Sequence, residues 1–156
     1  MPPLTPPVTP PVTPRVTLHG APGLFDGVPY AYSAHRSAPG TLLFTAGACP
    51  IDATGTVVAP GDVRGQTEQV LANLVVALEA GGASFADVVR TTVYVATTDR
   101  ADLLTAWEVF HAFCGGYPAP STLLGVTVLG WPGQLVEIEA VAVLPDDGAT
   151  PAAPAD

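Results

Sequence analysis

The stretch DVRGQTEQVLANLVVALEAGGASFADVVRTTVYVA, residues 62–96, decides the fold. Its first half has apolar residues at three- and four-residue steps, which predicts a helix over residues 62–80 with one apolar face. The apolar positions are Val63, Val70, Leu71, Leu74, Val75 and Leu78. Asp62 is suited to cap this helix, and Gly81 with Gly82 ends it. The second half is rich in β-branched residues and predicts a buried strand over residues 88–96.

Further elements are expected on both sides of this unit. Upstream, the pattern predicts strands over residues 28–36 and 41–46 and a short strand at 56–58; downstream, it predicts a second helix over 99–114 and strands over 121–129 and 134–143. A strand, helix, strand crossover is right-handed, so both helices should lie on one face of a single mixed sheet. The other face needs cover, most simply from another subunit.

Length and composition indicate one folded domain. The chain has 156 residues, of which 48% are hydrophobic and 12% charged, enough apolar surface for one core. Residues 1–17 repeat Thr-Pro-Pro-Val and read as a solvated polyproline arm or as a ligand for a proline-binding module. Residues 146–156 read as a flexible acidic tail. The domain is therefore placed at residues 18–145.

The charge balance excludes several functions. Fourteen acidic residues face five arginines and no lysine, for a net charge of −9. The negative charge disfavours nucleic acid as a partner. The absence of lysine excludes a lysine Schiff base and a phosphate-loop lysine. No apolar run is long enough to span a membrane and no secretion signal is visible, so we expect a cytoplasmic protein without a membrane partner. Cys49 and Cys114 are expected to be reduced, with one disulfide as the alternative.

The last predicted strand carries two carboxylates. Side chains alternate along a strand, so Val136, Ile138, Ala140 and Ala142 should face the helices. Glu137 and Glu139 then lie on the opposite face, about 7 Å apart. A carboxylate among apolar side chains can act as a general acid or base. The alternative is that both are solvated residues at an edge.

Other reactive side chains give weaker patterns. His111 and Cys114 are three residues apart on a helix, but no second pair completes a metal site, so a core cysteine beside a helix-end histidine is expected. Cys49 could be a nucleophile, although the sequence places no histidine to activate it. Trp131, beside Pro132, reads as a turn or interface residue, or as a stacking platform.

Five stretches together resemble one known family. They are Pro29-Tyr30, TLLFTAGACPID (41–52), QVLANLVVALEAGGASFADVVRTTVYV (69–95), YPAPST (117–122) and VEIEAVAV (136–143). The chain is similar to the Rid/YjgF reactive-intermediate deaminases (RidA-like, formerly L-PSP endoribonucleases). The resemblance implies an α+β, chorismate-mutase-like (bacillus-type) fold, assembled as a homotrimer with active sites in clefts between subunits.

The resemblance also implies a reaction and roles for residues. In the family's deaminases, water attacks the C=N carbon of an imine derived from a 2-aminoacrylate-type enamine, releasing ammonia and a 2-keto acid. No metal or organic cofactor is implied. Tyr30 matches the tyrosine near the ligand, Gly47 the glycine of the strand-end loop, and Glu139 the glutamate that positions water or moves a proton. Asn73 matches a helix asparagine with a structural role.

Two departures alter the implied pocket. Pro120 stands where the family's deaminases have an arginine that grips the substrate carboxylate, and Ala48 replaces a glutamine. Proline has no charge and no donor. Ser121 and Thr122 keep neutral donors nearby, whereas nothing in the sequence places Arg36 or Arg90 in the cleft. The expected ligand is therefore neutral or carries its polar group elsewhere.

The sequence thus leads to one preferred function and two alternatives. The preferred one is hydrolysis of a reactive imine, enamine or related small metabolite, with Glu139 catalytic and backbone amides near Gly47 as polar anchors. The residues expected around the substrate are Tyr30, Gly47, Ala48, Pro120, Ser121, Thr122, Glu137 and Trp131. One alternative is a non-catalytic trimer that binds a small molecule or a partner; the other, a ribonuclease, is disfavoured by the negative charge.

Overall fold

The computed structural model of the chain describes residues 16–36 and 39–145. Most of the expected polyproline arm, residues 37–38 and the expected acidic tail lie outside the described residues. The elements in chain order are β1 (Thr17–His19), β2 (Ser33–His35), β3 (Gly40–Phe44), α1 (Val63–Ala80), a 3₁₀ turn (Phe85–Asp87), β4 (Val88–Ala96), α2 (Arg100–Cys114), β5 (Ser121–Val126) and β6 (Val136–Pro145).

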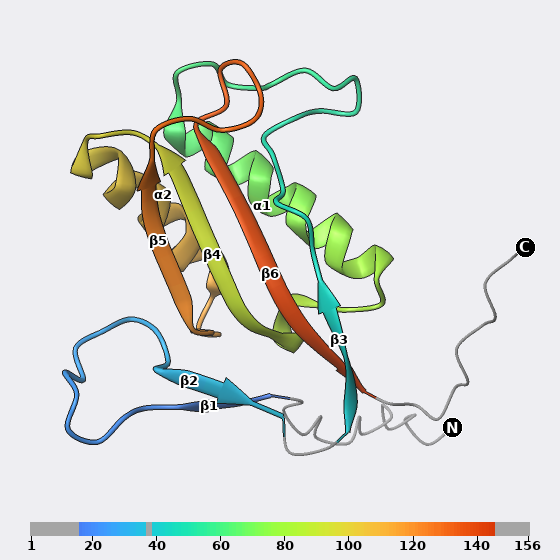
Figure 1. Ribbon diagram of the computed structural model, residues 1–156, viewed down its shortest axis with the longest axis vertical. Coiled ribbons are helices and arrows are strands. Elements are labelled where there is room, and N and C mark those ends of the chain that lie inside the picture. The colour runs from blue at the N-terminus through green and yellow to red at the C-terminus, as the bar shows by residue number, and fades with distance from the viewer. Residues whose placement is uncertain (1–15, 37–38, 146–156) are drawn as a thin grey trace, which may run out of the picture.

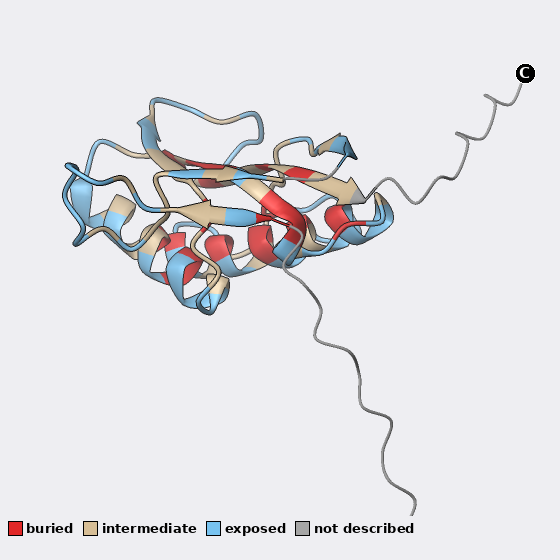
Figure 2. Cartoon of the chain, turned by 90° about the horizontal axis from the view of Figure 1, so that it is seen from below, coloured by how far each residue is buried: buried red, intermediate tan, exposed pale blue. Residues whose placement is uncertain are grey.

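A four-stranded mixed sheet in the order β3-β6-β4-β5 forms the centre of the fold (Figure 1). β4 and β5 are parallel, whereas β6 is antiparallel to both β3 and β4. Both helices lie on one face, so the molecule has two layers with the buried residues between them (Figure 2). This α+β arrangement confirms the expected mixed sheet with two helices on one face.

The expectation for residues 28–36 is wrong in part. Only Ser33–His35 is a strand, and it pairs antiparallel with Thr17–His19 in a separate two-stranded sheet. Pro29 has no N–H to donate to a ladder. The amides of Ala31 and Tyr32 donate instead to the carbonyls of Pro118 and His19. The short strand expected at 56–58 is reduced to a single bridge between Ile51 and Val57.

The core lies where α1 packs on the sheet. Val70, Leu71, Leu74 and Leu78 are buried, as the helical spacing predicts, and each contributes roughly 1.5–3 kcal/mol relative to exposure. Val75 is only partly buried, and Gln66 takes a fully buried place instead. Its Nε2 donates to the carbonyls of Ala59 and Gly133, and its Oε1 accepts from the amide of Leu135. This polar core residue fixes the loops at one end of the sheet.

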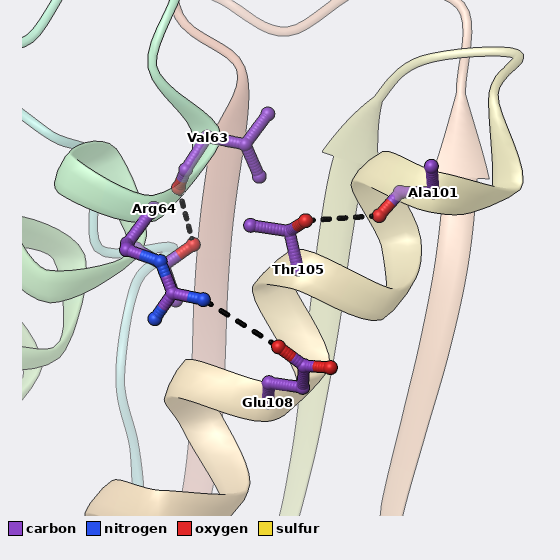
Figure 3. Close-up of polar contacts among 6 residues, drawn as sticks. Val63, Arg64, Ala101, Thr105 and Glu108 are labelled. Atoms are coloured by element: carbon purple, nitrogen blue, oxygen red, sulfur yellow. Dashed lines mark hydrogen bonds and ion pairs between the residues drawn. The ribbon is translucent and has the colours of Figure 1, made fainter.

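The helix ends follow the expected signals with one exception. The Asp99 side chain accepts from the amide of Ala101, and Gly115 ends α2 with φ of 55°. Asp62 precedes α1, but its side chain makes no capping hydrogen bond. Arg64 and Glu108 join the helices through a 3.4 Å ion pair, shown in Figure 3. Because both side chains are exposed, this pair adds at most about 1 kcal/mol. No helix of the described residues is long and apolar enough to cross a membrane.

Candidate functional site

The alternation expected along β6 is present. Val136, Ile138, Ala140 and Ala142 are buried under the helices. Glu137 and Glu139 therefore lie on the opposite, open face of the sheet. Across β4 they pair with Tyr94 and Thr92, respectively. Both carboxylates thus stand on the sheet face that the helices leave uncovered.

Tyr94 is the direct partner of Glu139. Its hydroxyl donates a 2.9 Å hydrogen bond to Glu139 Oε1. This bond, together with burial and the carboxylate's negative charge, raises the pKa of Tyr94. Sequence reasoning did not select Tyr94. The signal was the two-residue alternation in β4, which puts Thr92 and Tyr94 on the same face.

Glu137 packs against the loop that follows β3. A Cβ atom on Gly47 would lie 1.8 Å from Glu137 Oε1, so only glycine allows this approach. Gln134 donates a 2.9 Å hydrogen bond to Glu137 Oε2 and accepts one from the amide of Trp131. Ala48 pairs with Ile138 through both backbone groups. The amide of Ala48 is therefore occupied and cannot serve as a polar anchor for a ligand.

Cys49 lies beside the same carboxylate. Its Sγ is 3.7 Å from Glu137 Oε2 and 3.7 Å from the Gly47 carbonyl oxygen. Burial and the negative charge of Glu137 raise the pKa of the Cys49 thiol. Because the thiolate is the nucleophilic form, this setting opposes the nucleophile alternative.

Asn73 holds the loop that carries these residues. Its Nδ2 donates 2.8 Å hydrogen bonds to the carbonyls of Cys49 and Ile51. Gln69, one turn earlier on α1, donates to Asn73 Oδ1 at 2.9 Å. The contacts of Asn73 are those of a structural residue, as the family resemblance implied.

A second group of candidates lies at the β5 edge of the sheet. Tyr30 meets the Trp107 ring edge-on, with ring centroids 6.2 Å apart. An open pocket of about 470 Å³ is lined by Tyr30, Leu104, Trp107, Ser121, Thr122 and Leu123. Pro120 leads into β5, and its carbonyl accepts from the amide of Thr91 at 3.0 Å. Ser121 Oγ lies 2.6 Å from Thr91 Oγ1.

The open sheet face connects the two groups. Thr92 pairs with Glu139 on one side and with Thr122 on the other, so these three residues form one row across three strands. Two strand spacings put the backbones of Thr122 and Glu139 about 10 Å apart. Within the described residues, no hydrogen bond or ring contact joins Tyr30 to either glutamate.

Two arginines considered as substitute cations now have definite places. Arg36 donates to the Val143 carbonyl at 3.4 Å, near the far end of β6. Arg90 is exposed on the open face and donates to Thr122 Oγ1 at 3.3 Å. Of the two, Arg90 is the one that the structure brings to the candidate site.

The remaining reactive side chains lie elsewhere. Both cysteines are free thiols. Burial raises the pKa of Cys114 to about 11, and the ring of His111 stacks against Trp107. Among residues 16–36 and 39–145, no three histidine, cysteine or acidic side chains are grouped to hold a metal ion.

Known proteins share this architecture. The family model described as Endoribonuclease L-PSP matches residues 28–144. The 2-iminobutanoate/2-iminopropanoate deaminase of Escherichia coli K12 is 36% identical over 110 residues, which cover 67% of this chain and 80% of that protein. The crystal structure of the Rid-family protein YyfB from Yersinia pestis has a TM-score of 0.73 at 32% identity, covering 83% of this chain and 99% of that one. The structure of E. coli TdcF with bound serine has a TM-score of 0.58 at 30% identity, covering 85% and 96%.

These matches agree with the two-layer fold. The fold is that of the Rid proteins of known structure. The chain belongs to the Rid/YjgF family, also described as the L-PSP endoribonuclease family.

Proposed function

We propose that this chain hydrolyses a reactive imine, enamine or related small metabolite in clefts between the subunits of a homotrimer. The observation that carries the proposal is the row of Glu139, Thr92 and Thr122 on the open sheet face, which runs from a candidate acid–base to a pocket with aromatic walls. Family membership and a relative named as an imine deaminase support a role of this kind.

The open face supports the trimer with the chorismate-mutase-like arrangement. Leu42, Phe44 and Leu124 lie on it and are 56%, 68% and 42% exposed, respectively. Large apolar side chains exposed at both edges of one sheet face are typical of a face that packs against a partner. A second copy packed on this face would cover these side chains and enclose the row of polar residues. The resulting loss of water would strengthen electrostatic interactions with a ligand.

The proposed chemistry needs only water and a proton carrier. Glu139 takes a proton from the water whose oxygen attacks the imine carbon, and it passes this proton to the imine nitrogen. In the same way it carries the proton of the new hydroxyl group to the amine nitrogen. The C–N bond of the tetrahedral intermediate then breaks, ammonia leaves, and the carbon–oxygen double bond forms. Tyr94 holds one oxygen of Glu139, leaving the other for water. In this proposal Tyr30 is a pocket wall, and no cofactor takes part.

Pro120 limits which substrates the cleft can bind. A charge-assisted hydrogen bond contributes roughly 1.5–3 kcal/mol, and proline can form none with a substrate carboxylate. The standard deamination of a 2-imino acid, with the carboxylate held by an arginine at this position, is therefore not proposed.

A coupled assay tests the hydrolysis. An amino-acid oxidase generates imines in place, and semicarbazide traps those that survive. The wild type should reduce the trapped imine, Glu139→Gln should not, and Glu79→Gln, at an exposed position of α1, should behave as wild type. A silent wild type overturns the proposal and favours binding without turnover. If only Pro120→Arg hydrolyses the imine, the residue at position 120 alone accounts for the lack of activity in the wild type.

A further inference from the structure

Arg90 lies on the open face near the start of β4, and among the described residues it has no ion-pair partner. Its neighbour across β6 is Val141, and within the described residues no carboxylate pairs with it. By contrast, Arg64 on α1 is paired with Glu108. Because no carboxylate is paired with its guanidinium, Arg90 can bind an anion from outside the protomer.

The contact between Arg90 and Thr122 joins this charge to the pocket. Nη2 of Arg90 donates to Thr122 Oγ1, and Thr122 also lines the pocket of about 470 Å³ at the edge of β5. A hydroxyl that accepts from arginine keeps its own hydrogen for a second acceptor. The guanidinium has further N–H groups in a planar fork that matches a carboxylate. Together they can hold both oxygens of one carboxylate.

The register puts this pair beside Pro120. Thr91 pairs with Ser121, and its amide donates to the Pro120 carbonyl, so Arg90 is level with Pro120, the residue that precedes β5. Arg90 also lies diagonally from Glu139, a spacing of about 7–8 Å in an antiparallel pair. A small ligand held at Arg90 is therefore within reach of the candidate acid–base.

Apart from Ser121, the rest of the pocket wall is mostly apolar. Tyr30, Trp107, Leu104 and Leu123 present two aromatic and two aliphatic side chains. We propose that Arg90 and Thr122 bind the carboxylate of a small ligand whose apolar or aromatic side chain lies against these four residues. This inference rests on the proposed function, because it names the class of substrate for that cleft: carboxylates with a bulky apolar substituent.

Binding to the full chain tests this site without turnover. The probes are phenylpyruvate, which has both parts, pyruvate, which lacks the ring, and phenylacetone, which lacks the carboxylate. Titration calorimetry compares the wild type with Arg90→Gln and with the control Arg64→Gln. Arg90→Gln should weaken phenylpyruvate binding about ten- to a hundredfold. It should leave phenylacetone binding unchanged, and Arg64→Gln should leave both unchanged.

Several results would overturn the site. They are no phenylpyruvate binding by the wild type, equal binding of phenylacetone and phenylpyruvate, or equal effects of the two arginine variants. Arg90→Lys, which keeps the charge but loses the fork, should bind with intermediate affinity and serves if Arg90→Gln does not fold. The two proposals fail separately. If the chain binds phenylpyruvate through Arg90 but does not hydrolyse imines, the binding site stands and the proposed hydrolase activity is refuted. If the chain hydrolyses imines and Arg90→Gln has no effect on the rate, only the proposed binding site is refuted.

Discussion

The Tyr94 hydroxyl donates a 2.9 Å hydrogen bond to Oε1 of Glu139. The two side chains lie on the same face of the sheet and come from the neighbouring strands β4 and β6. The contact fixes one oxygen of the carboxylate to which we assign the proton transfer. The same carboxylate raises the pKa of Tyr94, because it accepts the hydrogen bond and its negative charge opposes ionisation of the hydroxyl. Tyr94 therefore acts through Glu139 as a positioning residue.

Tyr94→Phe should lower kcat for imine hydrolysis about tenfold, the value of one hydrogen bond to a charged group, with little change in KM. Tyr32→Phe is the matched control, because the Tyr32 hydroxyl donates to the Phe25 carbonyl in the loop between β1 and β2. Titration of tyrosinate absorbance gives a second readout. Glu139→Gln should lower the pKa of Tyr94, since the negative charge that opposes ionisation is gone. An unchanged Tyr94 titration would contradict the pairing.

Gly47→Ala should disturb the site more than the fold. The new Cβ would lie 1.8 Å from Glu137 Oε1, and this flexible side chain must move, losing its contact with Gln134. We expect a loss of stability of about 1 kcal/mol and a clear loss of activity. Gly130→Ala is the control, because a Cβ there meets nothing within 4 Å. Equal activity of the two variants would show that Glu137 has no part in the reaction.

Asn73→Asp should destabilise the loop that carries Cys49. A carboxylate cannot donate, so it would face the carbonyls of Cys49 and Ile51 with two acceptor oxygens. Urea unfolding should show a loss of about 2–3 kcal/mol, against about 1 kcal/mol or less for Gln69→Ala, which removes a single contact of Asn73. Similar losses for both variants would mean that the two carbonyl contacts do not stabilise the chain.

The sequence predicts the central layers well because their signals are local. The spacing in residues 62–80 and the β-branched run in 88–96 correspond to α1 and β4 almost residue for residue. Alternation alone places Glu137 and Glu139 on the open face. The β1–β2 pair was missed because each strand has only three residues and β1 begins at Thr17, within the segment interpreted as a polyproline arm. No local pattern marks such a pairing.

Contacts between strands limit what the sequence can say about the site. Tyr94 and Arg90 matter through their neighbours on β6 and β5, and only the register identifies those neighbours. Arg90 could be named as a candidate cation but not placed. The burial of Gln66 in place of Val75 also depends on loops that no helical pattern describes.

Phe44→Glu tests the proposed trimer. Phe44 is 68% exposed on the open face, and a charge there would have to be buried in the assembly. Light scattering should give three times the 15.8 kDa chain mass for the wild type and a smaller mass for the variant. Val76→Glu, at a 65% exposed position on α1, should leave the mass unchanged. A monomeric wild type would refute the assembly.

Stability should fall in alkali through two partly buried groups, Tyr117 and Cys114. Burial, with a smaller contribution from the charge of Asp87, raises the pKa of Tyr117 from 10.0 to about 12, and burial raises that of Cys114 from 9.0 to about 11. The folded chain keeps both protons over a range where the unfolded chain has lost them. The stability from these groups is therefore complete below pH 9 and is lost as the pH rises to about 12.

Urea titrations at intervals from pH 9 to about 12 should show this decline. Tyr117→Phe should be less stable than wild type by about 1 kcal/mol at neutral pH, because the Val88 carbonyl loses its donor. Its decline above pH 10 should be shallower, since one of the two groups no longer titrates. Cys114→Ala should flatten the earlier part of the curve, from pH 9 to about 11. Parallel curves for all three proteins would show that neither group is held protonated by the fold.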